Sequence, residues 1–341
     1  MSQDRVTSID VAKEAGVSQS AVSRVFSQTG SASQKTIDKV QKAADKLGYR
    51  PNILARSLIT GKSRIIGLLV AYLENYFYPE AVEILSRELQ KQGYHVLIFL
   101  ASSKEGNLDN IVQELLDYQV DGIVTASVSM SSDLAQSCQS AGIPVVMFNR
   151  IDDSKTANSV TADNYQGGYD AARYFIETGH EKISYIAGWE GASTQRDREA
   201  GFIEGLSQSG LTLHSRAVGD YDQERAKQAA HLLFDTDDRP DAVFVANDHM
   251  AFAVMDVIRF DYGLSIPDDV AIIGFDDVPP AAWPAYNLTT LRQPANAMVH
   301  ATIDTLISQI VEPQKERTDT ILPSPMIIRA STRKTPLKSM K

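Results

Sequence analysis

The first fifty residues carry apolar side chains three or four positions apart, which is the period of one face of an α-helix. Ser8 and Ser18 can each cap the start of a helix, because a serine hydroxyl accepts a hydrogen bond from a free backbone N–H there. Gly16 and Gly48 can end the preceding helices in the left-handed conformation. The pattern therefore predicts three helices, at residues 8–15, 19–27 and 33–47.

From residue 65 the pattern changes to short apolar runs that alternate with amphipathic segments, which predicts an α/β fold with parallel sheets. The predicted strands are residues 65–71, 95–101, 121–127 and 143–149 in a first unit, and 182–188, 216–221, 242–248 and 270–277 in a second. Helices are expected near residues 79–92, 107–118 and 131–141. The predicted fold is an all-α headpiece followed by two successive α/β units.

The second predicted helix directs small polar side chains away from the core of the headpiece. Gln19, Ser20, Ser23 and Arg24 lie outside when the apolar positions face inward. Two short helices joined by a glycine turn form a helix-turn-helix, whose second helix fits the major groove of DNA. There, glutamine pairs with adenine and arginine with guanine edges. An ordinary three-helix bundle with a solvated polar face has the same spacing, so the pattern alone leaves both interpretations open.

The segment YRPNILARSL, from Tyr49 to Leu58, predicts a third kind of element. Pro51 can open a helix, because its missing N–H would be unpaired at that position. Isolated helices below roughly 12–15 residues are marginal in water. We therefore expect this helix to form only when a binding event orders it.

Charge separates the two parts of the chain. The net charge is −10 over 341 residues, but residues 1–62 hold ten Lys and Arg against five Asp and Glu. This segment has a charge of +5 and the remainder has −15. Only the first part suits a polyanion such as nucleic acid.

Composition limits the class of protein further. The chain is 43% hydrophobic and 22% charged, as in soluble globular proteins, and has no run of 18 apolar residues. Its start, MSQDRVTSID, lacks the apolar stretch of a signal peptide, and Cys138 is the single cysteine. We expect a cytoplasmic protein with no membrane contact and no disulfide framework. The six histidines show no metal spacing, and we expect no cofactor.

The segments VTSIDVAKEAGVSQSAVSRVF (6–26), LGYRPNILARSL (47–58) and SRIIGLLV (63–70) resemble the lactose/galactose repressor family of bacterial transcription regulators. The match is specific in the first 70 residues and continues more loosely to about Arg329. The resemblance implies a helix-turn-helix headpiece at 1–48, a hinge helix and linker at 49–62, and an effector-binding and dimerisation domain at 63–341.

The same resemblance implies which residues contact DNA. The recognition helix would begin at Gln19, and the hinge helix would enter the minor groove, where Leu58 wedges between base pairs. The alternative for Leu58 is hydrophobic packing under the sensor. Tyr49, Asn52 and Arg56 are expected to contact phosphates. The implied DNA-binding residues are Ser18, Gln19, Ser20, Ala21, Ser23, Arg24, Tyr49, Asn52, Ala55, Arg56 and Leu58.

The family's sensor is similar to periplasmic sugar-binding proteins, which have two lobes. Here the chain would cross between lobes near Asp163, Gln293 and Leu322. The implied N-lobe is about 63–163 with 294–322, and the C-lobe is about 164–293 with 323–341. The cleft between the lobes would hold the effector, in agreement with the rule that ligands bind beyond the carboxyl ends of parallel strands.

Polar residues at the strand ends are candidates for binding the effector, because carboxylates, amides and arginine bind hydroxyls and aromatic faces cover sugar rings. The motif STQRDREAGF resembles the family's pattern and implies Thr194 and Arg198 in the cleft. The full candidate set is Phe77, Asn149, Thr194, Arg198, Tyr221, Asn247 and Asp276. For Asp248 and Asp277 the alternative is capping of a helix. We expect His249 on a helix surface, and for Arg150 the alternative is a surface or interface position.

These patterns predict a ligand-controlled, DNA-binding transcriptional regulator, expected to be a repressor acting on a palindromic operator. The effector is expected to be a sugar or sugar derivative, although members of this family that respond to purines share the scaffold. The tail STRKTPLKSMK has no heptads for a tetramer, so a homodimer is expected.

An enzyme and a secreted solute-binding protein are the alternatives. The G-x-G-x-x-G, G-x-x-x-x-G-K, H-E-x-x-H and G-x-S-x-G signatures are absent from the sequence, and the basic headpiece disfavours the solute-binding protein.

Overall fold

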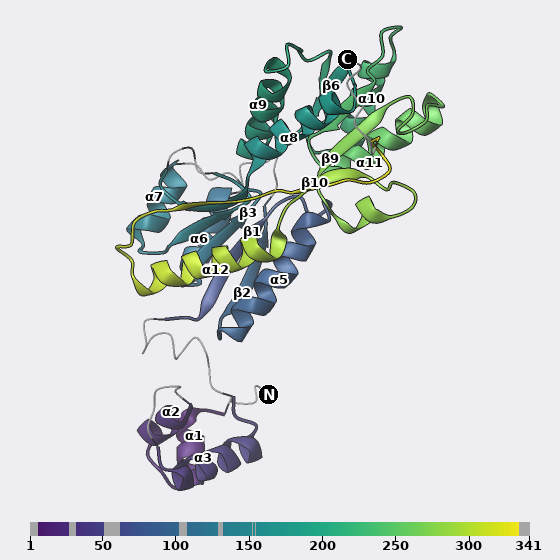
Figure 1. The fold of residues 1–341 in the computed structure, drawn as a ribbon. Coiled ribbons are helices and arrows are strands. Elements are labelled where there is room, and N and C mark those ends of the chain that lie inside the picture. Colours follow the sequence, from purple (N-terminus) through teal and green to yellow (C-terminus); the bar gives the residue numbers. More distant parts are fainter. Residues whose placement is uncertain are drawn as a thin grey trace. The chain divides into compact units, whose positions relative to one another are not determined.

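The computed structural model describes residues 6–26, 32–50, 62–101, 108–128, 132–151, 153 and 155–333 (Figure 1). The chain divides into two compact units between Ser63 and Arg64. The predicted hinge residues Asn52, Ala55, Arg56 and Leu58 lie outside the described residues.

The headpiece is the predicted bundle of three helices, α1 (Ser8–Ala15), α2 (Gln19–Phe26) and α3 (Gln34–Leu47). Gly16 and Gly48 both follow a helix with φ of +65°, as expected for left-handed caps. The prediction that Ser8 caps α1 is wrong by one residue. Thr7 is the N-cap, and its N–H and hydroxyl both donate to the Asp10 carboxylate, which lowers the pKa of Asp10.

The second unit contains two lobes, each built on one six-stranded sheet. The first sheet is entirely parallel, in the order β11-β5-β4-β3-β1-β2. Its strands are β1 (Ile65–Val70), β2 (His95–Leu100), β3 (Gly122–Ala126), β4 (Val145–Phe148), β5 (Asn158–Ala162) and β11 (Asp319–Leu322). Within the described residues, the helices that cover it are α5 (Phe77–Lys91), α6 (Leu108–Asp117), α7 (Ser132–Ser140) and α12 (Ala295–Val311).

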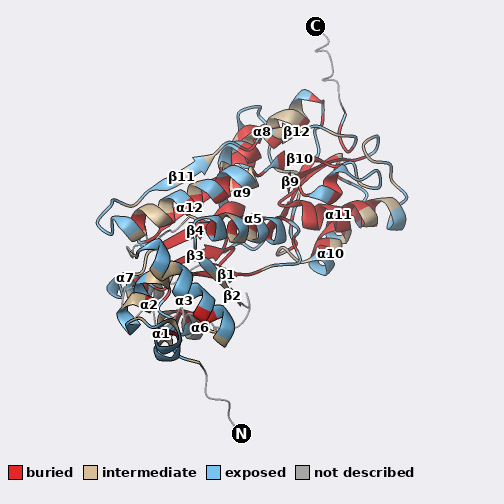
Figure 2. Ribbon diagram, turned by 90° about the horizontal axis from the view of Figure 1, so that it is seen from below, coloured by how far each residue is buried: buried red, intermediate tan, exposed pale blue. Residues whose placement is uncertain are grey.

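Alternate residues of β1 enter two different cores, as the two-residue period of a strand requires. Ile66 and Leu68 pack with residues of α5 and α12, whereas Leu69 packs with Leu115 of α6 and Cys138 of α7. Figure 1 shows α5 and α12 side by side along one face of this sheet. The inner strands β1, β3, β4 and β5 are buried on both faces, which Figure 2 shows in red, whereas the edge strands β2 and β11 are partly exposed.

The second sheet has the order β12-β10-β9-β8-β6-β7, with β12 antiparallel to β10 at one edge. Its strands are β6 (Ile183–Ala187), β7 (Arg216–Val218), β8 (Ala242–Val245), β9 (Ala271–Asp276), β10 (Thr289–Arg292) and β12 (Met326–Ile327). The accompanying helices are α8 (Asn164–Glu177), α9 (Ser193–Ser207), α10 (Gln223–Phe234), α11 (Asp248–Asp256), the π-helical turn η1 (Val257–Asp261) and the 3₁₀ turn η2 (Pro279–Ala282).

All eight strands expected from the sequence are present, with ends shifted by a few residues. Strands β5, β10, β11 and β12 were not expected. The sequence of β5, NSVTA, lacks a continuous apolar run, and β12 has two residues. The chain passes from one sheet to the other after Ala162, Arg292 and Leu322.

Helices α8 and α9 approach so closely that two glycines are required at their contact. A Cβ on Gly168 would lie 2.0 Å from the carbonyl oxygen of Arg198, and one on Gly201 would lie 1.9 Å from that of Tyr165. This contact aligns α9 so that the Arg198 Nε donates to the Asn164 side-chain oxygen at 2.8 Å. Close packing of these helices therefore fixes the position of a buried arginine.

We expect Gly201→Ala to destabilise the second unit by about 1–3 kcal/mol, because the added methyl group meets backbone that must move. Urea unfolding monitored by circular dichroism measures this free energy. Ser207→Ala, on an exposed position of the same helix, is the matched control and should change it by less than about 0.5 kcal/mol. Equal stability of Gly201→Ala and wild type would contradict the packing argument.

Candidate ligand-binding cleft

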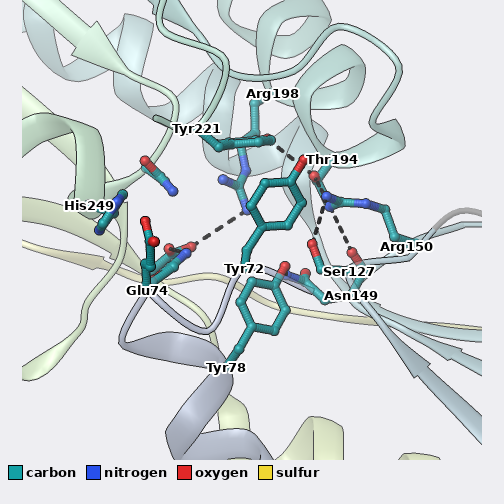
Figure 3. A pocket seen from close by; sticks show the side chains of 13 residues that line it. Tyr72, Glu74, Tyr78, Ser127, Asn149, Arg150, Thr194, Arg198, Tyr221 and His249 are labelled. Atoms are coloured by element: carbon teal, nitrogen blue, oxygen red, sulfur yellow. Dashed lines mark hydrogen bonds and ion pairs between the residues drawn. The ribbon is translucent and has the colours of Figure 1, made fainter. Parts of the chain in front are cut away.

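A polar cavity lies where the carboxyl ends of both sheets face each other (Figure 3). The cavity volume open to the centre of a water molecule is about 30 Å³, which is enough for a few atoms. A larger ligand therefore has to displace contacts among the lining side chains. These are Tyr72, Glu74, Asn75, Tyr78, Ser127, Asn149 and Arg150 from the first lobe, and Thr194, Arg198, Tyr221, Asn247, His249 and Asp276 from the second.

Arg198 extends from α9 and is 2% exposed. Its Nε donates to Asn164, and its Nη1 donates to the Ala246 carbonyl oxygen at 2.5 Å. The guanidinium carbon lies 3.6 Å from the centre of the Phe275 ring, and Nη2 is 3.8 Å from the nearer carboxylate oxygen of Asp276. The cation is thus held by a π face, by two acceptors and by one carboxylate.

Asp276 ends β9 and is 3% exposed. Its carboxylate accepts hydrogen bonds from Asn75 of the other lobe at 3.1 Å and from Gln293 at 2.6 Å. Burial raises the pKa of Asp276, and the neighbouring Arg198 opposes this shift. The carboxylate is consequently both a ligand candidate and part of the contact between lobes.

Arg150 occupies the opposite end of the cavity from His249 and Glu74, as Figure 3 shows. Its Nη1 donates to Thr194 Oγ1 at 2.6 Å and to the Asn149 carbonyl at 3.1 Å. Its Nη2 donates to Ser127 Oγ at 3.1 Å. The contact with Thr194 joins the two lobes.

Two tyrosines from different lobes give the cavity aromatic surface. The rings of Tyr72 and Tyr221 meet edge to face, with centres 6.3 Å apart. The Tyr221 hydroxyl is 3.4 Å from Thr194 Oγ1. A Cβ on Gly188 would lie 2.3 Å from the Tyr221 ring, so glycine at that position gives the ring its room. Aromatic faces beside convergent polar groups suit a ligand with both hydroxyls and an apolar side.

Six of the seven candidate residues predicted from the sequence line the cavity, namely Asn149, Thr194, Arg198, Tyr221, Asn247 and Asp276. Phe77 does not. It opens α5 with its ring stacked 5.9 Å from that of Phe148, at 2% exposure in the core of the first lobe. The next residue, Tyr78, lines the cavity instead and accepts a hydrogen bond from Asn149 Nδ2 at 3.1 Å. Burial raises the pKa of Tyr78.

Several lining residues escaped the sequence reasoning. The expectation that His249 lies on a helix surface is wrong, because it is 5% exposed and faces the cavity; burial lowers its pKa. Arg150 is likewise buried. A signal for Arg150 existed, since it directly follows Asn149 at the end of a predicted strand. Tyr72, Glu74, Asn75 and Ser127 were also missed, although the first three follow the first predicted strand.

Asp248 does not cap α11, because Asn247 is the N-cap and accepts from the Met250 N–H at 3.0 Å. Asp248 is fully buried beside the cavity, where it accepts from the Val278 N–H at 3.1 Å and from Thr290 Oγ1 at 2.6 Å. Burial raises the pKa of Asp248 from 3.8 to about 8, and the nearby charge of Asp276 adds to this shift. Asp277 instead pairs with two arginines, Arg292 and Arg329, at 2.5 and 2.6 Å.

In the headpiece, four of the residues predicted to contact DNA share one face of α2, namely Gln19, Ser20, Ser23 and Arg24. Ser18, Gln19, Ser20, Ser23 and Arg24 are exposed, and Ala21 is half-buried. Tyr49 is half-buried, with its ring 5.8 Å from that of Phe26, so most of its side chain packs on the headpiece.

Two absences hold for the described ranges. No helix there is both long and apolar enough to cross a bilayer. Those same ranges contain no group of three or more histidine, cysteine or carboxylate side chains arranged to hold a metal ion.

A helix-turn-helix bundle joined in one chain to a two-lobed unit with a polar inter-lobe cavity defines the class of ligand-responsive DNA-binding regulators. Family comparison agrees. The family described as bacterial regulatory proteins, lacI family, matches residues 8–52, and the periplasmic binding protein-like domain matches residues 172–332.

The chain is 31% identical over 330 residues to the HTH-type transcriptional repressor PurR of Photobacterium profundum, covering 95% of this chain and 98% of the relative. In structure, the chain is similar to the lac repressor dimer bound to operator and the anti-inducer ONPF, with a TM-score of 0.87 and 26% identity. This match covers 96% of this chain and 99% of the lac repressor chain. The chain is also similar to a transcriptional regulator CelR–cellobiose complex, with a TM-score of 0.73 and 28% identity. This match covers 96% of this chain and 100% of the CelR chain. The chain belongs to the lacI family of bacterial regulatory proteins, and is a DNA-binding transcriptional regulator and not an enzyme.

We expect Asp248→Asn to flatten the pH dependence of stability. The folded protein binds a proton at Asp248 that the unfolded chain loses above 3.8, so stability falls as pH rises towards the folded pKa of about 8. Replacing the carboxyl by an amide removes roughly 2–4 kcal/mol of this fall between about pH 5 and about pH 8. Urea unfolding at several pH values measures it. Asp304→Asn, at an exposed carboxylate of α12, is the matched control for the loss of one carboxyl group.

Proposed function

We propose that this protein is a dimeric repressor whose affinity for a palindromic operator is controlled by a small metabolite bound between the sensor lobes. The single observation that carries the proposal is the buried cavity, in which polar side chains from both lobes converge on a common space. In this proposal residues 1–48 read DNA, residues 49–62 form the hinge, and residues 63–341 bind the metabolite and the second subunit.

The DNA-binding part of the proposal rests on the exposed polar face of α2. Gln19 is exposed and donates to Ser8 Oγ at 3.1 Å, which supports its place at the start of a recognition helix. Arg24 is exposed one turn later, suited to a guanine edge. The predicted minor-groove contacts, with Leu58 as the wedge, remain part of the proposal.

A sugar or sugar derivative is the proposed effector. The cavity offers amide, hydroxyl, carboxylate and guanidinium groups for hydroxyls, and the rings of Tyr72 and Tyr221 for an apolar face. The cellobiose named in the complex of the relative CelR supports this class of ligand.

Contacts between the lobes offer a means of control. Asn75 donates to Asp276, Arg150 donates to Thr194, and the Ile151 N–H donates to Ser193 Oγ at 3.0 Å. A ligand that replaces some of these bonds changes the relative stability of two lobe arrangements. Coupling between two sites in allosteric proteins is typically about 1–3 kcal/mol and acts in both directions.

The experiment begins with DNA selected by the purified protein from a random palindromic library. Arg198→Ala should bind this DNA within about twofold of wild type but lose the response to metabolites, because it removes the cation that organises the cavity. Arg24→Ala is the reciprocal control, losing about 1–3 kcal/mol of DNA binding and keeping the metabolite response. Fluorescence anisotropy measures both. A normal metabolite response in Arg198→Ala would move the effector site elsewhere.

The edge of the first sheet supports a homodimer. Strand β2 is an edge strand, and its Ile98 and Leu100 are 47% and 62% exposed. Apolar side chains on an open edge favour burial against another chain. Leu100→Glu should weaken self-association at least about tenfold, because a charge would enter the interface.

Sedimentation equilibrium measures this change in self-association. Leu232→Glu, at a leucine on α10 that is 76% exposed, is the matched control and should associate as wild type does. If Leu100→Glu associates like wild type, the subunit contact lies on another face.

A further inference from the structure

Among the described residues, Arg150 is a buried cation with no carboxylate in ion-pair contact, although it is near enough to Asp276 to oppose the rise in pKa that burial gives that carboxyl. It is 3% exposed, yet no carboxylate of the described residues lies within ion-pair distance of its guanidinium. Its hydrogen bonds go to two hydroxyls, Ser127 and Thr194, and to the carbonyl of Asn149. Its Nε is buried and has no acceptor. Buried charges in proteins are usually paired, so this arrangement requires a specific explanation.

The other arginine of the cavity provides an internal comparison. Arg198 is equally buried, but it stacks on Phe275, uses its Nε, and has the Asp276 carboxylate 3.8 Å away. The two arginines therefore differ in pairing at the same degree of burial. Among the described residues, one cation has a carboxylate 3.8 Å away, and the other has none within ion-pair distance.

The cavity is polarised along its length. Arg150 lies at one end with hydroxyl and amide groups, whereas Glu74 and His249 lie at the other, as Figure 3 shows. A ligand with an acidic group at one end and hydroxyls along its length matches this distribution. A second negative group would meet the carboxylates of Glu74 and Asp276.

We propose that the effector is a polyhydroxy acid whose single anionic group pairs with Arg150, while its hydroxyls bind towards the end formed by Glu74 and His249. The guanidinium fork fits a carboxylate and a phosphate alike in a bidentate manner. A phosphate monoester carries nearly two negative charges at neutral pH, and the carboxylates of Glu74 and Asp276 line the same cavity, so the single charge of a carboxylate is favoured. This inference rests on the proposed function, because it assigns the ligand class of the same cavity. It makes Arg150 the residue that determines specificity between acidic and neutral sugars.

Arg150 also joins the two lobes, so a purely structural role has to be distinguished. Arg196 is the matched control. It too joins the lobes, with Nη2 2.6 Å from the Asp153 carboxylate, but it is exposed and outside the cavity lining. If Arg150 has a purely structural role, Arg150→Gln should weaken the binding of acidic and neutral ligands equally. If Arg150 pairs with the acid, the same substitution should remove the difference in affinity between acidic and neutral ligands.

The test uses isothermal titration of the full chain at constant ionic strength with matched probes. These are D-glucuronate against D-glucose, D-galacturonate against D-galactose, D-gluconate against sorbitol, and D-glucose 6-phosphate as a separate arm. At least one carboxylate should bind wild type at least about tenfold more tightly than its neutral partner. Arg150→Gln should abolish this preference, Arg150→Lys should keep part of it, and Arg196→Gln should keep all of it.

The other outcomes overturn the inference. If no carboxylate exceeds its neutral partner in wild type, or if Arg150→Gln keeps the preference, Arg150 does not select an acid. Binding of the phosphate alone through Arg150 would refute the carboxylate. If the effector is a neutral sugar bound through Arg198, the inference of an acidic effector is refuted and the proposed function stands. If no metabolite changes DNA binding, the inference and the proposed function are both refuted.

Discussion

The two lobes depend on one constraint, which is that polar groups at the ends of two parallel sheets are buried against each other and must find partners there. Asn75 and Asp276 satisfy this requirement across the cleft, as do Arg150 and Thr194. Leaving one such group unsatisfied costs about 1–3 kcal/mol. The groups that hold the lobes together are consequently the same groups that a ligand can engage.

The charges of the buried carboxyl groups also affect how the cleft can bind a ligand. Asp248 and Asp276 lie close enough for each to disfavour the other's charge, and burial raises the pKa of both. Gly274 permits the approach, because a Cβ there would lie 2.2 Å from the Asp248 carboxylate. With one carboxyl protonated near neutral pH, the cleft holds less negative charge than its composition indicates.

The sequence was informative where local physics decides the outcome. Continuous apolar runs predicted the strands, and Ser18, Ser33, Gly16 and Gly48 marked the helix ends closely. It failed where tertiary packing decides. Strand β5 is polar by composition and buried only because it lies between β4 and β11.

The residues of the cavity likewise divide into those that local sequence predicts and those that tertiary packing decides. Polar residues after predicted strands identified Asn149, Asn247 and Asp276. The choice between Phe77 and Tyr78 depends on the direction in which the first turn of α5 faces, because successive side chains of a helix point about 100° apart. His249 was misjudged because its helix begins inside the cleft, so even its first turn is buried. Predicting which of these residues line the cavity requires knowing how the two lobes are arranged in space, and no local sequence pattern contains that information.

The energies involved suit a switch better than a rigid scaffold. A net intramolecular hydrogen bond contributes about 0.5–1.5 kcal/mol, and one to a charged group about 1.5–3 kcal/mol, so each of the bonds from Asn75, Arg150 and Ile151 across the cleft has by itself the size of a typical allosteric coupling. A helix as short as the predicted hinge is itself marginal, so a bias of this size can decide whether it forms. A stronger contact between the lobes would hold one arrangement regardless of the metabolite, and a weaker one would transmit nothing to the DNA.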